Sequence, residues 1–339
     1  MSGRSARGGV LLSSPLSIEK AQPKVGRASC PPADAFARHT RARQAAPLRM
    51  FPCFPFVLRA VVAIVCATIL GCATMPEPPL HMRRARRFAS IASRNHAAGE
   101  MDKALLYYSR ALNIYRGTDS RADTVECLQS VAVVHRELGN LDEATECAAE
   151  ALVIARELGA ARHEVDALAT LGTVLYSQGD TDEAENYLRE AMELARSIGY
   201  ERAIADQRNS LGLVSKKRGG YEDAMRHYSA AARIYQKLGD KPGQAACLNN
   251  MGALLEAQDK YNEALEKYNQ ALALDKEAGN VEGIAVGLNN LGNLHLKLGQ
   301  PEKAVGYFQR AYYVNTWLGR PDRAAQDLEQ AEKALSLLQ

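Results

Sequence analysis

The sequence predicts an all-α fold, a solenoid built from antiparallel helical hairpins. Three observations support this prediction. Residues recur with a period of 40 over most of the chain, small residues occupy fixed places in each period, and apolar residues within a period recur every three to four positions. The last spacing is that of an amphipathic α-helix. Because the chain is repetitive, its length of 339 residues gives no domain count.

Three columns of alanine or glycine define the period, and each is filled in all six rows. The first column is Ala104, Ala144, Ala184, Ala224, Ala264 and Ala304. The second is Ala111, Ala151, Ala191, Ala231, Ala271 and Ala311, and the third is Ala92, Ala132, Gly172, Gly212, Gly252 and Gly292. A further glycine closes rows at Gly159, Gly199, Gly239, Gly279 and Gly319.

One row shows how the hairpin forms. Its apolar and small positions at helical spacing are Leu168, Leu171, Leu175 and, past the turn, Ala184, Leu188, Ala191 and Leu194. Gly179 suits a left-handed position that ends the first helix, and Asp180 or Thr181 can cap the second. In the last row Pro301 falls in the first turn of the second helix, where its missing N–H is tolerated. We expect Gly172 to face Ala184 where the two helices cross, because small residues allow the backbones to approach closely.

Over roughly Met82–Gln339 the sequence resembles the tetratricopeptide repeat family, whose small-residue signature falls on these three columns. The period differs, since the family's usual repeat has 34 residues and ends in a proline that this chain replaces with glycine. The resemblance implies a right-handed superhelix in which the first helices line the concave face. Six units and a capping helix are expected, at about 85–120, 121–160, 161–200, 201–240, 241–280, 281–320 and 321–339, which together form the solenoid 83–339.

Residues ahead of the solenoid are expected to form separate segments. Residues 1–49 contain nine Arg or Lys and two Asp or Glu, without a sustained apolar period, so we expect a disordered extension or a start codon assigned too early. Residues 50–71 predict a signal peptide, because the uncharged run from Ala60 to Met75 is too short for a comfortable membrane span. Residues 72–82 follow as a proline-bearing tether.

The signal segment ends in Ile69-Leu70-Gly71-Cys72, which resembles the lipobox of bacterial lipoproteins, although Leu70 is larger than usual. The resemblance implies lipidation at Cys72, and Ala73 after the cysteine favours the outer membrane. The localisation expected is therefore the periplasmic face of the bacterial outer membrane, with the lipid as anchor. An ordinary cleaved signal, an N-terminal membrane helix and an organelle transit peptide remain alternatives. The arginine cluster at residues 83–87 is interpreted as a solvated helix start, with contact to anionic headgroups as the alternative.

The composition and spacing favour binding over catalysis. Residues 73–339 carry 32 basic and 37 acidic side chains, which is no electrostatic footprint for nucleic acid. His135 and His295 occupy a packing position, and no histidine or cysteine spacing indicates a metal site. The recurrent glycines are explained by the repeat and form no phosphate-binding loop, and we expect neither enzyme activity nor a cofactor. Cys127 and Cys147 lie on facing helices, and buried thiols are preferred there over a disulfide.

A candidate peptide-binding face follows from carrying the family's concave positions onto each first helix. It comprises Tyr176, Asn209, Lys216, Lys217, Asn249, Asn289, Asn293 and Lys297. An amide both donates and accepts, so Asn209, Asn249 and Asn289 form a ladder that can pair with a peptide backbone. The lysines can hold a carboxylate. The alternative is that these amides link neighbouring hairpins. The second asparagines, Asn250 and Asn290, are interpreted as structural.

The function predicted is a membrane-anchored scaffold or adaptor of the bacterial envelope that binds an extended peptide or partner protein on its concave face. Its partners would be a protein or peptide and, through the anchor, the membrane. A soluble or organellar scaffold of the same repeats, with an N-terminal transit or membrane segment and no lipid, is the alternative.

Overall fold

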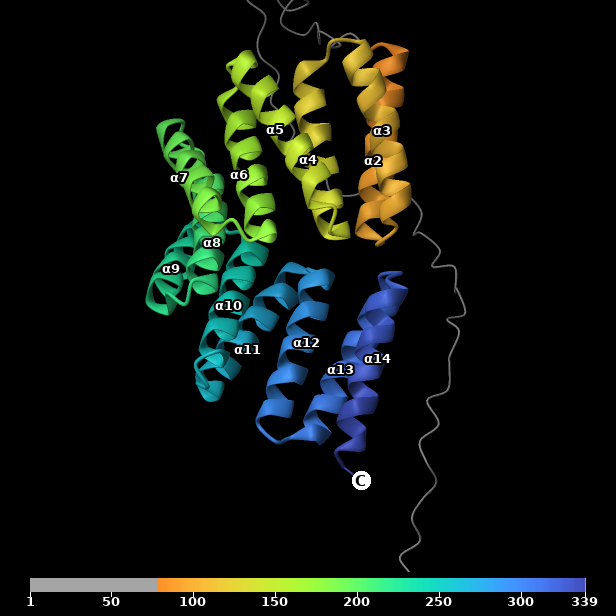
Figure 1. The fold of residues 1–339 in the computed structure, drawn as a ribbon. Helices are drawn as coiled ribbons and strands as arrows, with labels where there is room; N and C mark the ends of the chain where they lie inside the picture. Colours follow the sequence, from red (N-terminus) through yellow and green to blue (C-terminus); the bar gives the residue numbers. More distant parts are fainter. Residues whose placement is uncertain (1–77, 339) are drawn as a thin grey trace, which may run out of the picture. The chain divides into compact units, whose positions relative to one another are not determined.

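The described part of the chain consists of helical hairpins and one terminal helix. The computed structural model describes residues 78–338, and within them the chain forms thirteen α-helices and no strand (Figure 1). The helices are α2 (Leu80–Ala97), α3 (Met101–Gly117), α4 (Arg121–Leu138), α5 (Leu141–Leu158), α6 (Ala161–Gln178), α7 (Thr181–Ser197), α8 (Glu201–Lys217), α9 (Tyr221–Leu238), α10 (Lys241–Glu256), α11 (Tyr261–Ala278), α12 (Val281–Lys297), α13 (Pro301–Trp317) and α14 (Pro321–Ser336). The predicted signal segment and Cys72 lie outside the described residues.

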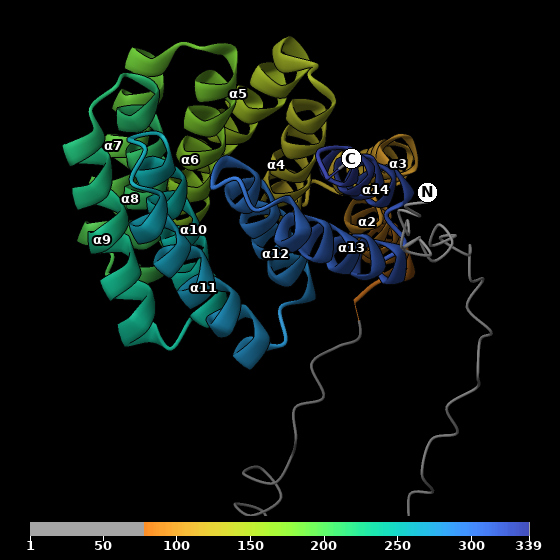
Figure 2. The ribbon, with the colours of Figure 1, turned by 90° about the horizontal axis from the view of Figure 1, so that it is seen from below.

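Successive helices pair into six antiparallel hairpins, from α2–α3 to α12–α13, and α14 follows as a single terminal helix. The predicted α-solenoid with six units and a capping helix is therefore confirmed. The first helices of the central hairpins, α4 to α12, lie on the inner side of the curved array, and the second helices lie outside them (Figure 2). Consecutive first helices also contact one another, as α4 does α6.

The hairpin crossing depends on the small-residue columns. Gly252 on α10 lies against the ring of Tyr268 on α11, and a Cβ at Gly252 would approach Tyr268 Cε1 to 2.6 Å. Gly172 meets the side chain of Leu188 and the backbone of Ala184, as the sequence predicts. The glycine column therefore provides room for a large side chain of the paired helix, which the tyrosine or leucine fills completely.

Turns between helices use left-handed backbone. Gly179 ends α6 with φ of 105°, and its N–H reaches back to the carbonyl of Leu175. The predicted side-chain cap of α7 is absent, since Asp180 accepts no hydrogen bond from the first turn. Asp119 and Asp259 adopt positive φ values of 52° and 59° at turns where most rows have glycine. Aspartate is among the few residues that tolerate this conformation.

Ion pairs connect the outer helices of successive hairpins. Arg116 on α3 pairs with Glu150 on α5, and Arg156 on α5 pairs with Glu190 on α7, so both pairs span 34 residues. The partners are half-exposed, and such pairs contribute little individually.

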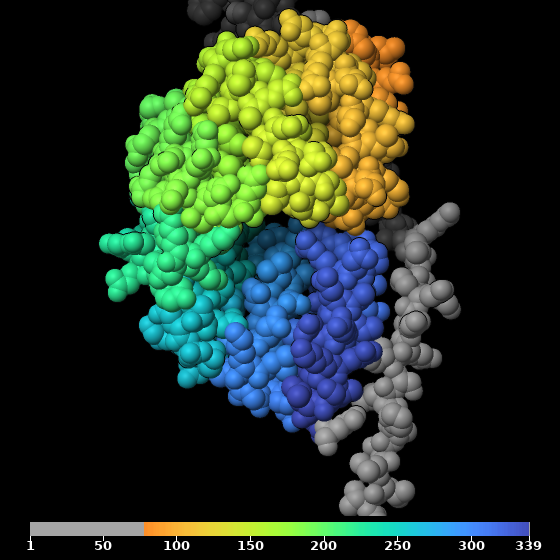
Figure 3. All heavy atoms as spheres, in the orientation of Figure 1, coloured from red at the N-terminus to blue at the C-terminus, as the bar shows by residue number. Residues whose placement is uncertain are grey.

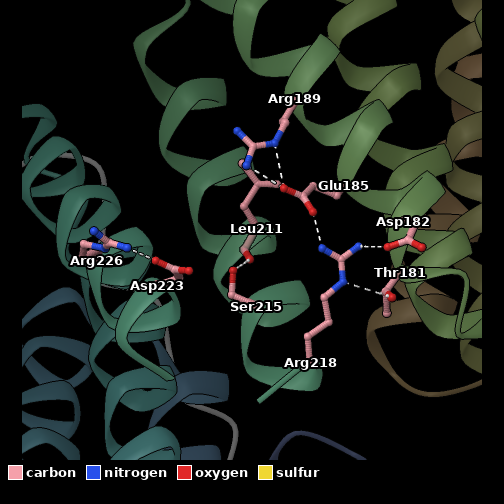
Figure 4. Close-up of polar contacts among 9 residues, drawn as sticks. All are labelled: Thr181, Asp182, Glu185, Arg189, Leu211, Ser215, Arg218, Asp223 and Arg226. Atoms are coloured by element: carbon pink, nitrogen blue, oxygen red, sulfur yellow. Dashed lines mark hydrogen bonds and ion pairs between the residues drawn. The ribbon is translucent and has the colours of Figure 1, made fainter. Parts of the chain in front are cut away.

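A denser polar cluster joins α8 to α7 (Figure 4). The Arg218 guanidinium donates to Thr181 Oγ1 at 3.3 Å and also to the carboxylates of Asp182 and Glu185. Arg189 donates to Glu185 from the next turn of α7 at 2.8 Å. Burial raises the pKa of Glu185, but the hydrogen bonds from both arginines outweigh it and bring the pKa below the ordinary value.

The array curves so that the last hairpin and α14 lie beneath the first hairpin in Figure 1 and overlap it when seen from below (Figure 2). Arg320, between α13 and α14, donates from Nε to the carbonyl oxygen of Ala97 at 2.9 Å and pairs with Glu282 of α12. A cavity of about 500 Å³ lies at this seam, lined among others by His96 and Glu137. Among the described helices, none is both long and apolar enough to span a bilayer.

Candidate functional site

The inner face of the solenoid is where the sequence places a ligand. The space-filling view shows a hollow in the middle of one side, between the early hairpins in yellow-green and the late hairpins in blue (Figure 3). The candidate ladder residues Asn209, Asn249 and Asn289 lie on α8, α10 and α12, the inner helices of three successive hairpins. All three side chains are half-buried.

Two of the three ladder amides bond to the next hairpin. Asn209 Oδ1 accepts a hydrogen bond from Asn250 Nδ2 on α10 at 2.8 Å. Asn289 Nδ2 donates to Asp327 Oδ1 on α14 at 2.7 Å, and its Oδ1 accepts from Asn293 Nδ2 at 2.9 Å. The amides at these two positions therefore brace neighbouring inner helices in the ligand-free chain.

Asn249 differs from the other ladder members. Its Oδ1 atom is buried and has no hydrogen-bond partner among the described residues. A buried acceptor without a partner costs about 1–3 kcal/mol. The centre of the ladder therefore has hydrogen-bonding capacity that the fold leaves unused.

Two of the three candidate lysines are also paired inside the fold. Lys217 Nζ donates to the carbonyl oxygen of Tyr176 at 2.9 Å and lies 4.8 Å from the centroid of that ring. Lys297 Nζ lies 2.9 Å from Glu256 Oε1. Each lysine thus reaches back to the end of the preceding inner helix.

Lys216 is the third lysine and remains without such a bond. It forms no hydrogen bond or ion pair with a described residue, although its side chain is half-buried. Burial lowers the pKa of Lys216, and the charge of Glu256 partly offsets this effect. A half-buried ammonium without a partner favours an incoming anion.

Glu256 is a polar residue beside the candidate lysines that the candidate set omits. One of its carboxylate oxygens accepts from the Tyr268 hydroxyl at 2.7 Å, while the other meets Lys297. Burial, followed by the bond to Glu256, raises the pKa of Tyr268. Glu256 lies in the same repeat column as the candidates Tyr176 and Lys216. This shared column could have identified Glu256 as a residue of the same face.

A row of carboxylates on the inner helices was also missed. Glu126, Asp166 and Asp206 stand 40 residues apart on α4, α6 and α8. Burial raises the pKa of Asp166 and of Asp206 above the ordinary value. Asp206 accepts a hydrogen bond from the Tyr235 hydroxyl, which partly opposes the shift.

Asp327 on the terminal helix is the most enclosed carboxylate of this face. It is 3% exposed and accepts from Asn315 Nδ2 at 2.6 Å in addition to Asn289. A cavity of about 200 Å³ adjoins it and is lined by Asn289, Asn290 and Arg323 among others. Since the sequence assigns α14 only a capping role, nothing in the repeat columns indicates this buried carboxylate.

The remaining polar candidates occupy packing positions. His295 is 5% exposed, stacks on Tyr307 with ring centroids 5.2 Å apart and bonds to Gln300 through Nδ1. His135 is half-buried, as expected for the same column. Cys127 is buried and Cys147 half-buried, and both are free thiols, in agreement with the preferred interpretation.

The fold defines an α-helical repeat protein, a solenoid of antiparallel hairpins whose first helices line its inner side. A family model described as tetratricopeptide repeat matches residues 124–197 and 204–277, and a second one of the same description matches residues 285–316. These matches cover more than half of the chain, which therefore belongs to the tetratricopeptide repeat family. None of the curated proteins matches the sequence.

Solved structures show the same fold at low sequence identity. A Rap protein complexed with competence and sporulation factor is 16% identical, with a TM-score of 0.57 over 76% of this chain and 77% of that one. The Rap conjugation gene regulator of plasmid pLS20, complexed with the Phr* peptide, is 16% identical with a TM-score of 0.57 and coverages of 75% and 76%. A signal transduction ATPase with a tetratricopeptide repeat sensor from Pyrococcus horikoshii is 16% identical, with a TM-score of 0.55 over 82% of this chain and 42% of that one.

Proposed function

We propose that the chain is a scaffold or adaptor that binds an extended peptide segment of a partner protein along its inner face. The observation that carries this proposal is the pair of unused polar groups on adjacent inner helices, Asn249 Oδ1 on α10 and Lys216 Nζ on α8. Both groups carry a desolvation cost in the ligand-free fold, because Asn249 Oδ1 is an unpaired acceptor and the Lys216 ammonium is a half-buried cation. The Rap conjugation gene regulator complexed with the Phr* peptide supports this use of the fold.

The two groups define what the bound segment must offer. A peptide N–H would supply the donor that Asn249 Oδ1 lacks after a small rotation of the amide. A carboxylate on the segment, either an acidic side chain or a chain terminus, would pair with Lys216. Leu213 and Ala253 lie half-buried on the same inner helices and provide apolar contact between the polar groups.

The role proposed is binding rather than catalysis. Lys216, Asn249 and the braced residues around them offer hydrogen bonds and charge, which suit recognition of a peptide. The acidic row of Asp166 and Asp206 lies on α6 and α8 and would favour basic side chains on the part of the segment that passes it.

A lipid anchor at Cys72 forms the second part of the proposal. The lipobox-like sequence Ile69–Cys72 supports it, and Ala73 supports placement in the bacterial outer membrane with the solenoid in the periplasm. Radiolabelled palmitate should label the chain, and Cys72→Ala should remove the label. A Cys72→Ala chain that is still processed and membrane-bound would instead favour a signal or transit segment without lipid.

Site-specific photo-crosslinking tests the binding site in cells. A photoreactive amino acid at Ala253 on the inner face should give a defined partner adduct, and the same probe at Arg233 on the outer side of α9 should not. The double variant Lys216→Ala, Asn249→Ala should lose the adduct from position 253. Lys260→Ala, Asn262→Ala removes the same two residue types from an exposed site and should retain it. Equal adducts from both double variants would refute the proposed site.

A further inference from the structure

The first helix of the solenoid has an unusual charge. Helix α2 contains five arginines, namely Arg83, Arg84, Arg86, Arg87 and Arg94, and no aspartate or glutamate. The first helices that follow it carry acidic residues at equivalent places, such as Asp123 on α4 and Asp166 on α6. The positive charge of α2 is therefore a property of this unit and not of the repeat.

These arginines lie on the surface of the chain. Ala85 and Ala92, seven residues apart, form the buried face of α2. Arg87 and Arg94 have the same spacing and lie on the opposite face, because two residues advance the helix by about 200°. Arg84, Arg86 and Arg87 are exposed and form no ion pair with a carboxylate of any described residue.

Aromatic and aliphatic side chains extend this surface. Arg84 lies 5.4 Å from the ring centroid of Phe88, and Arg110 of α3 lies 5.9 Å from the same ring and 5.3 Å from that of Tyr107. Leu80, at the start of α2, is 75% exposed. Arginine beside aromatic and aliphatic groups is the composition of surfaces that rest on the headgroup region of a bilayer.

The helix itself favours a negative partner at this place. Its N-terminus carries the positive end of the macrodipole, where cations destabilise a helix and anions stabilise it. Arg83 and Arg84 lie within the first turns, and that region contains no acidic side chain. An anionic surface in front of α2 would offset both the dipole and the arginine charges.

We propose that the α2 surface, defined as Arg84, Arg86, Arg87 and Arg110 with Leu80, binds anionic phospholipid headgroups of a bilayer. Charge complementarity and the exposed position of α2 at the start of the solenoid support this without any anchor. The third argument rests on the proposed lipidation. Cys72 precedes Leu80 by eight residues, which span at most roughly 28 Å, so an anchored chain keeps this surface close to the headgroups.

Sedimentation with lipid vesicles tests the proposal on the full chain carrying Cys72→Ala, so that its outcome is independent of lipidation. Binding to vesicles of phosphatidylcholine alone is compared with binding to vesicles that also contain phosphatidylglycerol. The anionic lipid should increase binding. Arg84→Gln, Arg86→Gln, Arg87→Gln should lower the partition coefficient for the anionic vesicles by on the order of 100-fold, given the usual effect of each basic residue near such a surface. Salt should weaken the same component.

A charge-matched variant provides the control. Arg233→Gln, Lys237→Gln, Lys276→Gln removes three exposed basic residues from outer helices and should leave the preference for phosphatidylglycerol nearly unchanged. An equal loss in both triple variants would mean that net charge alone drives binding and would overturn the proposal. Two other results also overturn it: displacement from vesicles by millimolar inorganic phosphate, and α2-dependent binding to polyglutamate without any preference for phosphatidylglycerol.

Discussion

Arg320 and Ala97 are 223 residues apart in the chain, yet the guanidinium of one donates to the backbone carbonyl of the other. The bond joins the last turn of the solenoid to the first hairpin, and the same guanidinium pairs with Glu282. The Arg320 side chain is only 11% exposed, so its charge is largely removed from water. The Arg320 side chain therefore bridges the first and last parts of the described solenoid.

We expect Arg320→Ala to loosen this seam while the individual hairpins remain folded. The variant removes a charged hydrogen bond and leaves Glu282 without its partner, at an expected loss of about 1.5–3 kcal/mol. Hydrogen exchange should accelerate at the C-terminal end of α2, where Ala97 lies. Lys333→Ala, at an exposed position of α14 outside the lining of the seam cavity, is the control and should leave exchange there unchanged. Unaltered exchange in the Arg320 variant would show that the seam does not depend on it.

Two glycines on inner helices, Gly252 and Gly287, differ in the space around them, and this difference is testable. Gly252→Ala places a methyl group against the Tyr268 ring, so we expect a loss of about 1–3 kcal/mol in the free energy of unfolding. Gly287 on α12 has its nearest neighbour at 3.5 Å from the added Cβ, so alanine fits there. Gly287→Ala should stabilise the chain by about 0.5–1 kcal/mol through helix propensity. Urea unfolding measures both, and a similar effect of the two substitutions would contradict the close contact.

The fold could be predicted from the sequence because each column reports a local requirement. A glycine at Gly252 is needed where a tyrosine side chain fills the crossing, and this need repeats with the hairpin. The hydrogen bonds of the inner face were harder to predict, because they recur only at every second hairpin. Gln129, Asn209 and Asn289 each bond to the following inner helix.

A second set of bonds alternates in the same way toward the preceding helix. Glu137 reaches His96, Lys217 reaches Tyr176 and Lys297 reaches Glu256. The side chains that reach out in both directions thus come from α4, α8 and α12, whereas Asn249 Oδ1 on α10 has no partner among the described residues. A column of residue types states which groups are present but not which neighbour each one reaches. For the same reason the pairing of Asn209 with Asn250, one expected to bind and the other to brace, was not predicted.

The Arg218 cluster should make the free energy of unfolding decrease as the pH falls into the acid range. The pKa of Glu185 is lower in the folded chain than the ordinary glutamate value near 4.3, so the folded state favours the ionised carboxylate. Its contribution is complete above that ordinary value and is lost as the pH falls through the lowered folded pKa. Urea unfolding from neutral pH to pH 3 should show a smaller decline for Glu185→Gln than for the natural chain. Glu222→Gln, at an exposed position of α9, should leave the decline as it is.

The three described cysteines should differ in reactivity. Burial raises the pKa of Cys127 and of Cys247 to about 12, and it also raises the pKa of Cys147, which is only half-buried. Because the thiolate is the reactive form, a disulfide reagent at pH 8 should modify Cys147 first in the folded chain. Mass spectrometry of the labelled peptides identifies the order. Rapid modification of Cys247 without unfolding would show that α10 opens locally.

Substitution of Asn249 and of Asn289, two of the three ladder residues, should have different effects on stability and on binding. Asn289→Ala leaves the buried Asp327 carboxylate with Asn315 as its remaining amide donor, so we expect a loss of about 1–3 kcal/mol in unfolding free energy. Asn249→Ala removes an acceptor that has no partner, so stability should stay the same or rise slightly. The crosslinked adduct from Ala253 should respond in the opposite sense, with the Asn249 variant losing it although its fold is intact. If Asn249→Ala instead destabilised the chain as much as Asn289→Ala, the Asn249 amide would be a brace like its neighbours, and the peptide site would have to rest on Lys216 alone.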